Sequence, residues 1–458
     1  MFSELHINIG PTLRVIESAR RQIPAVSDSG KAQLRDVHDS LRHAGVVCFC
    51  LAFERMITTI FPRALSRQSS IRIYQSSICF GLYPILKHRY HTSQNIREFN
   101  QERLPRSCTR NIQYAFDPVN IAATNRPSNL FSFLRPENVS LPNFQHANSI
   151  VPPSLGVPWP TSFPSCFQSK YWEEMEETTR AYTQELLAQR PGSYQAKYIE
   201  AMIDAAVSLL VNTAPMGNLT RMKVLAKLYV FFFVSDDLVD SGNRVMMIPS
   251  HIEGKEEQGP EYTVYNMLAK EILSEDLVQG KRLLESVISW TSATQQTPPE
   301  TFPTLEDYMS YRAGDVGAYA VFRSMEFACN VSFSDADFEA VARLRSLCER
   351  HFLLTNDLYS YAKEAVAEQK HGASVLNAVR VVQRLMNISE DSAKAIVRQL
   401  IWDVERQMNE EYERLLPGAP KSQLTCARGL IVSAAGNMFF SATCARYARV
   451  IEGSRLHT

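Results

Sequence analysis

Residues 229–240, at the end of a long apolar segment, read YVFFFVSDDLVD. On a helix of 3.6 residues per turn, Asp236 and Asp240 fall on the same face as Phe232 and Phe233. A plain amphipathic helix would carry its acids on the opposite face. A buried carboxylate is costly unless it is paired or bound to a metal. The stretch therefore predicts a helix whose last turns bind a cation; the alternative is a helix that ends there with exposed acids.

Helical periodicity continues on both sides of this stretch, from Tyr171 almost to the C-terminus, with few strand-like alternations. We expect helices over roughly 171–190, 194–212, 220–241, 262–292, 305–328, 335–367, 375–386, 391–415 and 422–451. Helices of this length and number predict an all-α bundle that forms one domain over residues 171–452.

The chain before this bundle differs in composition. Residues 1–115 carry 16 Lys/Arg against 8 Asp/Glu, which predicts a basic N-terminal extension, disordered or loosely packed. An organelle transit peptide is the alternative, although acids occur early and the segment is long for one. Residues 116–170 are rich in Pro, Ser and Asn and are expected to be an extended connecting segment.

Composition excludes several classes of function. The 48 basic and 48 acidic residues balance, so no overall field favours a nucleic-acid partner. The longest early apolar run, residues 44–53, is far shorter than the roughly 20 residues of a membrane helix. Nine scattered cysteines without a CxxC pair fit reduced thiols, which predicts a cytoplasmic protein without a membrane span.

A second motif follows about 120 residues after the first, where residues 356–364 read NDLYSYAKE. Asn356, Ser360 and Glu364 stand at i, i+4 and i+8, which places them along one helical face. An amide, a hydroxyl and a carboxylate offer the oxygen ligands that Mg²⁺ prefers beside phosphate. A solvated polar face would explain the spacing alone about equally well. Two such motifs on different helices favour a shared metal site.

At this point the chain resembles the class I terpene synthases, in particular the sesquiterpene cyclases of fungi and bacteria. Asp236-Asp237-x-x-Asp240 looks like the aspartate-rich motif of that family. Asn356-Asp357-x-x-Ser360-x-x-Lys363-Glu364 looks like its NSE motif, including the lysine, and this match is highly specific. The resemblance covers roughly residues 170–452 and not the first 115.

Two weaker matches follow in the order that the family has them. Arg312-Ala313-Gly314-Asp315-Val316 has the spacing of the diphosphate sensor, linker and effector on a broken helix. Arg312 would be the sensor, Asp315 the linker, and the carbonyl near Val316 the effector. Gly314 and Gly317 favour a helix break there. Arg446-Tyr447 looks like the diphosphate-contacting Arg-Tyr pair. One departure is Phe440, where many members carry Trp.

The resemblance implies an all-α class I fold around a central cavity, and a Mg²⁺-dependent terpene cyclase, a carbon–oxygen lyase, acting on a prenyl diphosphate. Three Mg²⁺ ions are expected, for which Mn²⁺ can substitute. Their ligands would be Asp236, Asn356, Ser360 and Glu364, and Asp237 and Asp240 would support these ligands. Arg312, Lys363, Arg446 and Tyr447 would hold the diphosphate, and Phe233 and Phe440 would line the cavity. A homodimer is compatible with it.

Farnesyl diphosphate and a sesquiterpene product are expected from domain size and motif style. The alternatives are a diterpene or other chain-length cyclase, a chain-elongating prenyltransferase, and a non-catalytic helical scaffold. A prenyltransferase would usually show two aspartate-rich motifs. A bifunctional class II cyclase would need a DxDD string, and Val234 stands where its first Asp would be.

Overall fold

The computed structural model describes residues 109–119, 130–138, 144–189, 196–240, 260–329, 333–371 and 375–456. The chain divides into two units after Glu102, and every described residue belongs to the second unit, Arg103–Thr458. The basic extension expected over residues 1–115 therefore lies, up to residue 108, outside the described part of the chain.

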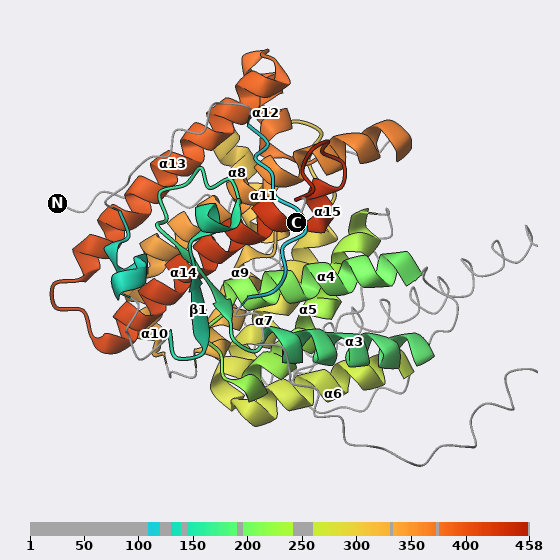
Figure 1. Cartoon of the computed structure of the whole chain (residues 1–458), viewed down its shortest axis with the longest axis vertical. Helices are drawn as coiled ribbons and strands as arrows, with labels where there is room; N and C mark the ends of the chain where they lie inside the picture. Colours follow the sequence, from blue (N-terminus) through green and yellow to red (C-terminus); the bar gives the residue numbers. More distant parts are fainter. Residues whose placement is uncertain are drawn as a thin grey trace, which may run out of the picture. The chain divides into compact units, whose positions relative to one another are not determined.

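The described residues are mostly helical, as predicted (Figure 1). The α-helices are α3 (Trp172–Gln189), α4 (Ala196–Thr213), α5 (Leu219–Asp240), α6 (Pro260–Glu275), α7 (Leu277–Thr294), α8 (Leu305–Asp315), α9 (Ala318–Ala328), α10 (Asp335–Ala340), α11 (Ala342–His371), α12 (Ala378–Met386), α13 (Glu390–Leu415), α14 (Lys421–Thr443) and α15 (Ala445–Ala448). No helix among the described residues is long and apolar enough to cross a bilayer.

Helix α14 runs through the core of this bundle. From Thr425 to Ala442 every side chain but Arg428 is buried, because apolar and small residues cover all faces of the helix. It packs against α4, α9 and α11. A Cβ atom on Gly436 would lie 1.9 Å from the carbonyl oxygen of Asn212, so only glycine allows α4 and α14 to approach this closely.

Four of the expected helices are interrupted, of which 335–367 divides at Val341 and 422–451 at Cys444. The segment expected as one helix over 262–292 is divided between α6 and α7 at Asp276, whose side chain accepts hydrogen bonds from Val278 N and Gln279 N and caps α7. The segment 305–328 breaks between Asp315 and Ala318, where Gly317 has a φ of 75°. The break within 305–328 was predicted from its glycines, and it lies beside the cavity described below.

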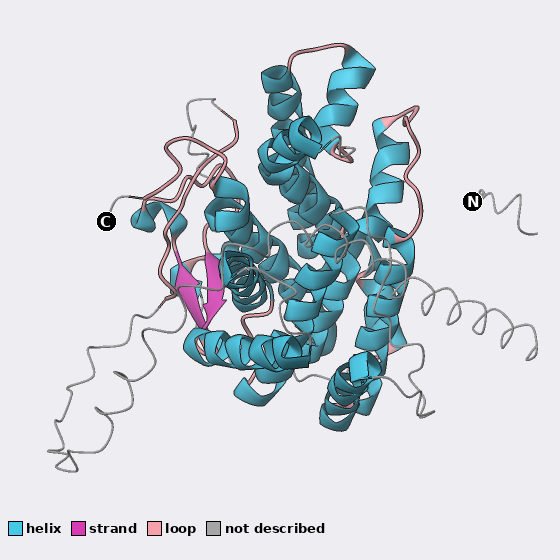
Figure 2. Ribbon diagram, turned by 90° about the vertical axis from the view of Figure 1, so that its right-hand side faces the viewer, coloured by secondary structure: helices cyan, strands magenta, loops and turns pink. Residues whose placement is uncertain are grey.

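The Pro-rich segment 116–170 is not merely a connector. It contains a two-stranded antiparallel sheet, β1 (Ala147–Ile150) and β2 (Cys166–Ser169), seen beside the helices in Figure 2. Short 3-10 helices lie at Ser132–Leu134, Pro136–Asn138 and Pro152–Leu155. Strand β2 is fully buried against α4 and α14. The prolines prevent long helices, but the aromatic residues between them are drawn into the core.

Residues 109–117 join the same unit, although the sequence placed most of them in the extension. Ala115 N donates to Ser454 O at 2.7 Å, and Leu456 N donates to Gln113 O at 3.0 Å. Asp117 pairs with the buried Arg398 of α13 at 2.5 Å. These contacts tie the described start of the chain to the segment that follows α15, so the unit begins before residue 115.

Candidate active site

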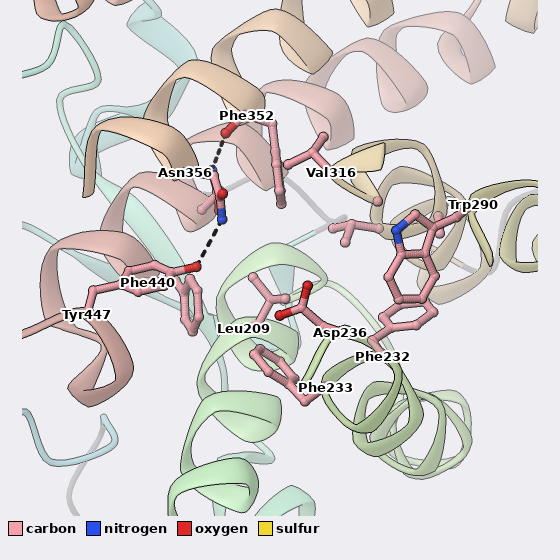
Figure 3. A pocket seen from close by; sticks show the side chains of 14 residues that line it. Leu209, Phe232, Phe233, Asp236, Trp290, Val316, Phe352, Asn356, Phe440 and Tyr447 are labelled. Carbon is pink, nitrogen blue, oxygen red and sulfur yellow. Dashed lines mark hydrogen bonds between the residues drawn. The ribbon is translucent and has the colours of Figure 1, made fainter. Parts of the chain in front are cut away.

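A cavity opens between α4, α5, α7, α11, α14, α15 and the break between α8 and α9 (Figure 3). It holds about 550 Å³ of empty space, its open mouth included, which is within the usual range of small-molecule sites. It is lined by Leu209, Phe232, Phe233, Asp236, Trp290, Val316, Gly317, Ala320, Val321, Phe352, Asn356, Asn437, Phe440 and Tyr447. Most of this lining is apolar or aromatic, with polar groups at few places.

Aromatic rings form much of the wall. In Figure 3, Trp290 and Phe232 lie across the cavity from Phe440 and Tyr447. The rings of Phe232 and Trp290 meet edge to face at 5.2 Å, and those of Phe440 and Tyr447 at 5.9 Å. Phe233 lies 6.4 Å from Phe440. Aromatic faces attract cations, so such a wall can stabilise positive charge while it excludes water.

The acidic end of α5 reaches the rim of this cavity. Asp236 is half exposed, and its Oδ2 accepts a hydrogen bond from Arg446 Nη2 of α15 at 2.8 Å. The Arg446 guanidinium also lies 5.7 Å from the centre of the Phe233 ring. Helix α5 extends to Asp240, but the side chains of Asp237 and Asp240 lie outside the described residues.

Asn356, Ser360 and Glu364 lie on α11 as predicted. Their side chains form hydrogen bonds with one another, with Asn377 and with α15. Ser360 Oγ donates to Glu364 Oε1 at 2.5 Å, and Asn377 Nδ2 donates to Glu364 Oε2 at 3.1 Å. Asn356 Nδ2 donates to the hydroxyl of Tyr447 at 2.9 Å. Burial raises the pKa of Tyr447, which keeps this hydroxyl neutral.

Arg312 of α8 is held beside this face by carboxylates. Its Nε and Nη2 each lie 3.2 Å from Asp357 Oδ1, and its Nη1 donates to Asp315. Nη2 also approaches Asn356 Oδ1 at 3.4 Å. Burial alone would lower the pKa of Arg312, but the charges of Asp357 and Asp315 outweigh it and raise the pKa well above its usual value. The guanidinium is therefore a fixed positive charge next to Asn356.

Asp357 is the buried centre of these contacts. It is 0% exposed and accepts from Arg312, from the Tyr308 hydroxyl, and from Ala378 N at 2.9 Å. Burial raises its pKa, whereas Arg312 lowers it. Since three donors surround the carboxylate, we regard it as ionised.

The donor atoms present fit a hard divalent cation. Among the described residues no three His, Cys, Asp or Glu side chains cluster as a metal site. The α11 face instead offers amide, hydroxyl and carboxylate oxygens, which suit Mg²⁺ that keeps waters and phosphate oxygens. Burial and the nearby Asp357 raise the pKa of Glu364, while Arg312 and Lys363 lower it. A bound cation would stabilise its ionised form.

Comparison with known proteins agrees with this geometry. Residues 227–407 match the family described as "Terpene synthase family 2, C-terminal metal binding". The chain is 29% identical over 374 residues to Terpene cyclase 6 of Gibberella fujikuroi, which covers 75% of this chain and 96% of the relative. It is 28% identical to Terpene cyclase aneC of Aspergillus aculeatus, covering 70% of this chain and 77% of that one.

A solved structure shares the fold. The crystal structure of aristolochene synthase from Penicillium roqueforti superposes with a TM-score of 0.50 at 19% identity, over 59% of this chain and 94% of the other. These matches support a class I terpene synthase. Its relatives are fungal terpene cyclases, and the matched domain is described as metal binding.

Most of the site residues predicted from the sequence meet at one cavity. Asp236, Asn356, Val316, Phe233, Phe440 and Tyr447 line it directly. Arg312 contacts Asn356, Arg446 contacts Asp236, and Asp315 pairs with Arg312. Ser360 and Glu364 continue the α11 face beyond Asn356. Lys363 is half-buried on the same helix and is not among the lining residues.

Three residues of the site were missed by the sequence analysis. Asp357 binds Arg312, Tyr308 donates a hydrogen bond to Asp357, and Trp290 lines the cavity. Asp357 lies inside the NSE motif, one residue after Asn356. This position, next to the metal-binding face, could have indicated a role in the site. No pattern in the sequence distinguishes Tyr308 or Trp290 from ordinary core residues.

Proposed function

We propose that the chain ionises farnesyl diphosphate and cyclises the resulting carbocation to a sesquiterpene hydrocarbon or alcohol, releasing diphosphate. The observation that carries the proposal is the meeting of four motifs from α5, α8, α11 and α15 at one cavity. The contacts Asp236–Arg446, Asn356–Tyr447 and Arg312–Asn356 link them pairwise.

The two ends of the site have different tasks. At the polar rim, Arg312 and Arg446 donate hydrogen bonds to the leaving diphosphate, and guanidinium groups can do so bidentately. The Tyr447 hydroxyl adds a further donor, and Lys363 adds positive charge on α11. Below the rim, Phe233, Phe440 and the other rings shield the cation from water until cyclisation is complete.

Asp236, Asn356, Ser360 and Glu364 would hold Mg²⁺, with Asp237 and Asp240 in support. Bound metal would neutralise the charge that develops on the leaving group. Three ions are expected, and Mn²⁺ is expected to substitute. The catalytic domain assigned to residues 171–452 is extended here by residues 109–119 and by the sheet of β1 and β2, because both contribute to its packing.

The relatives include cyclases named for an aristolochene product and for sesterterpene products. Aristolochene synthase prx2 of Penicillium rubens is 23% identical over 51% of this chain and 72% of its own length. The sesterterpene synthase btcA of Neocamarosporium betae matches over only 39% of this chain and 25% of its own. A cyclase for longer prenyl chains is the second candidate, supported by that match.

The test is turnover by purified protein with Mg²⁺, followed by gas chromatography and mass spectrometry. Geranyl, farnesyl, geranylgeranyl and geranylfarnesyl diphosphate are supplied separately. A cyclic fifteen-carbon product from farnesyl diphosphate alone is expected. Cyclic products from only the longer substrates would favour the second candidate, and none from any of them would overturn the proposal. Asn356→Ala and Glu364→Ala are expected to abolish turnover while the helical content is unchanged.

A further inference from the structure

The indole of Trp290, on α7, lies against both neighbours of Val316 at the break between α8 and α9. Its Nε1 donates a hydrogen bond to the carbonyl oxygen of Asp315 at 2.9 Å. On the other side, a Cβ atom at Gly317 would lie 3.2 Å from the same Nε1 and 3.3 Å from Cε2. One side chain thus contacts the residue before Val316 and the residue after it.

The Trp290 indole gives the Asp315 carbonyl a hydrogen-bond donor that helix α8 itself cannot provide. The last carbonyls of an α-helix lack intrahelical donors. At the end of α8, Val316 N still donates to Arg312 O at 2.9 Å, but the chain then turns at Gly317 into the left-handed region. The Asp315 carbonyl receives its hydrogen bond from Trp290 instead. The peptide groups that flank Val316 are therefore held from α7.

The same ring also belongs to the cavity wall. Trp290 is 8% exposed and lines the cavity, and its ring meets Phe232 edge to face at 5.2 Å (Figure 3). Phe232 precedes Asp236 by one helical turn on α5. Trp290 accordingly joins the wall below the acidic rim to the break that carries Arg312, Asp315 and Val316.

We infer that Trp290 is a positioning residue that holds the α8–α9 break so that the Val316 carbonyl faces the prenyl chain. This rests on the proposed function and on the expectation that the carbonyl near Val316 is the effector that supports the forming cation. A fixed dipole aimed at developing charge acts without reorganisation during the reaction. A displacement of about 1 Å at such a group can cost on the order of a hundredfold in rate.

The discriminating variant is Trp290→Phe, which keeps an aromatic ring in the wall and removes the N–H donor. Trp402→Phe is its matched control, because Trp402 Nε1 also donates to a backbone carbonyl, Pro160 O, at 2.9 Å, and Trp402 does not line the cavity. We expect kcat of Trp290→Phe to fall at least about tenfold below that of Trp402→Phe. KM should stay within about twofold, because the donors to the diphosphate are unchanged.

Equal kcat values for the two variants at equal melting temperature would overturn the inference. If Trp290→Phe unfolds, the inference is tested instead by fluorine NMR of the full-length wild-type chain labelled with 5-fluorotryptophan. Labelled Trp159→Phe, Trp172→Phe and Trp402→Phe chains then assign the other three tryptophan resonances, which leaves the Trp290 fluorine resonance by elimination. Addition of Mg²⁺ and inorganic diphosphate should shift that resonance and leave the Trp402 resonance in place. An unmoved Trp290 resonance would overturn the inference.

This second measurement also separates the inference from the proposed function. If the wild type converts none of the prenyl diphosphates, the proposed function fails, and the fluorine shift alone decides the role of Trp290. If the wild type is active and Trp290→Phe matches its control, the proposed function stands and the inference fails.

Discussion

Arg446 of α15 donates a hydrogen bond to Asp236 of α5 at 2.8 Å, across 210 positions of sequence. One of these residues is proposed to bind diphosphate and the other metal. Their pairing places both at the rim of the same cavity. If both proposed roles hold, each would exchange its partner on substrate binding, Asp236 for the cation and Arg446 for the phosphate oxygens.

Replacing Arg446 by Ala should therefore impair substrate binding much more than folding. Asp236 is half exposed, and pairs of this kind contribute at most about 1 kcal/mol to stability. We expect diphosphate affinity in the presence of Mg²⁺, measured by calorimetric titration, to fall at least about tenfold, because a charge-assisted donor is lost. Arg446→Lys should restore part of it. Unchanged affinity in Arg446→Ala would exclude a diphosphate contact.

Glu364→Gln should remove a metal ligand while it preserves shape. The amide keeps a single neutral oxygen where the carboxylate had a full charge, so Mg²⁺-dependent diphosphate binding should fall by about two orders of magnitude. Glu368→Gln is the control, since Glu368 lies one turn further along α11 and pairs with Arg380 at 2.5 Å. Equal binding by both variants would remove Glu364 from the metal site.

Asp357→Asn should destabilise the fold as well as the site. The carboxylate is fully buried and is surrounded by donors from Arg312, Tyr308 and Ala378. Breaking a buried ion pair from one side typically costs about 3 kcal/mol or more. Urea unfolding should show a loss of this order, with weaker diphosphate binding because Arg312 is no longer fixed. The same substitution at Asp403, whose partner Arg406 is exposed, should leave stability unchanged; a similar loss there would mean that burial is not the cause.

Local periodicity was enough to predict the α11 face, because Asn356, Ser360 and Glu364 lie on one helix whose spacing fixes their common direction. Asp357 could not be assigned in the same way. Its role depends on Arg312 and Tyr308 from α8, and no local pattern specifies that packing. The Pro-rich segment failed for a related reason: prolines exclude helices, but whether Phe163 and Phe167 are buried depends on the helices that receive them.

The break between α8 and α9 allows a direct comparison of its two glycines, which the sequence alone could not distinguish. Gly317 has a φ of 75°, and a Cβ there would press on the Trp290 indole. Gly317→Ala should lower the free energy of unfolding by about 1–2 kcal/mol and reduce kcat, because the left-handed conformation is strained for alanine and the indole must move.

Gly314 lies within α8, and its Cβ would meet only Ala293 Cβ at an ordinary 3.5 Å. Gly314→Ala should therefore be neutral or stabilise the protein by up to about 1 kcal/mol, through the lower entropy of the unfolded chain. Thermal unfolding and steady-state kinetics of both variants provide the check. If Gly317→Ala is as stable and as active as Gly314→Ala, the conformation at Gly317 does not hold the break, and its cause must lie elsewhere in the contact between α7 and α8.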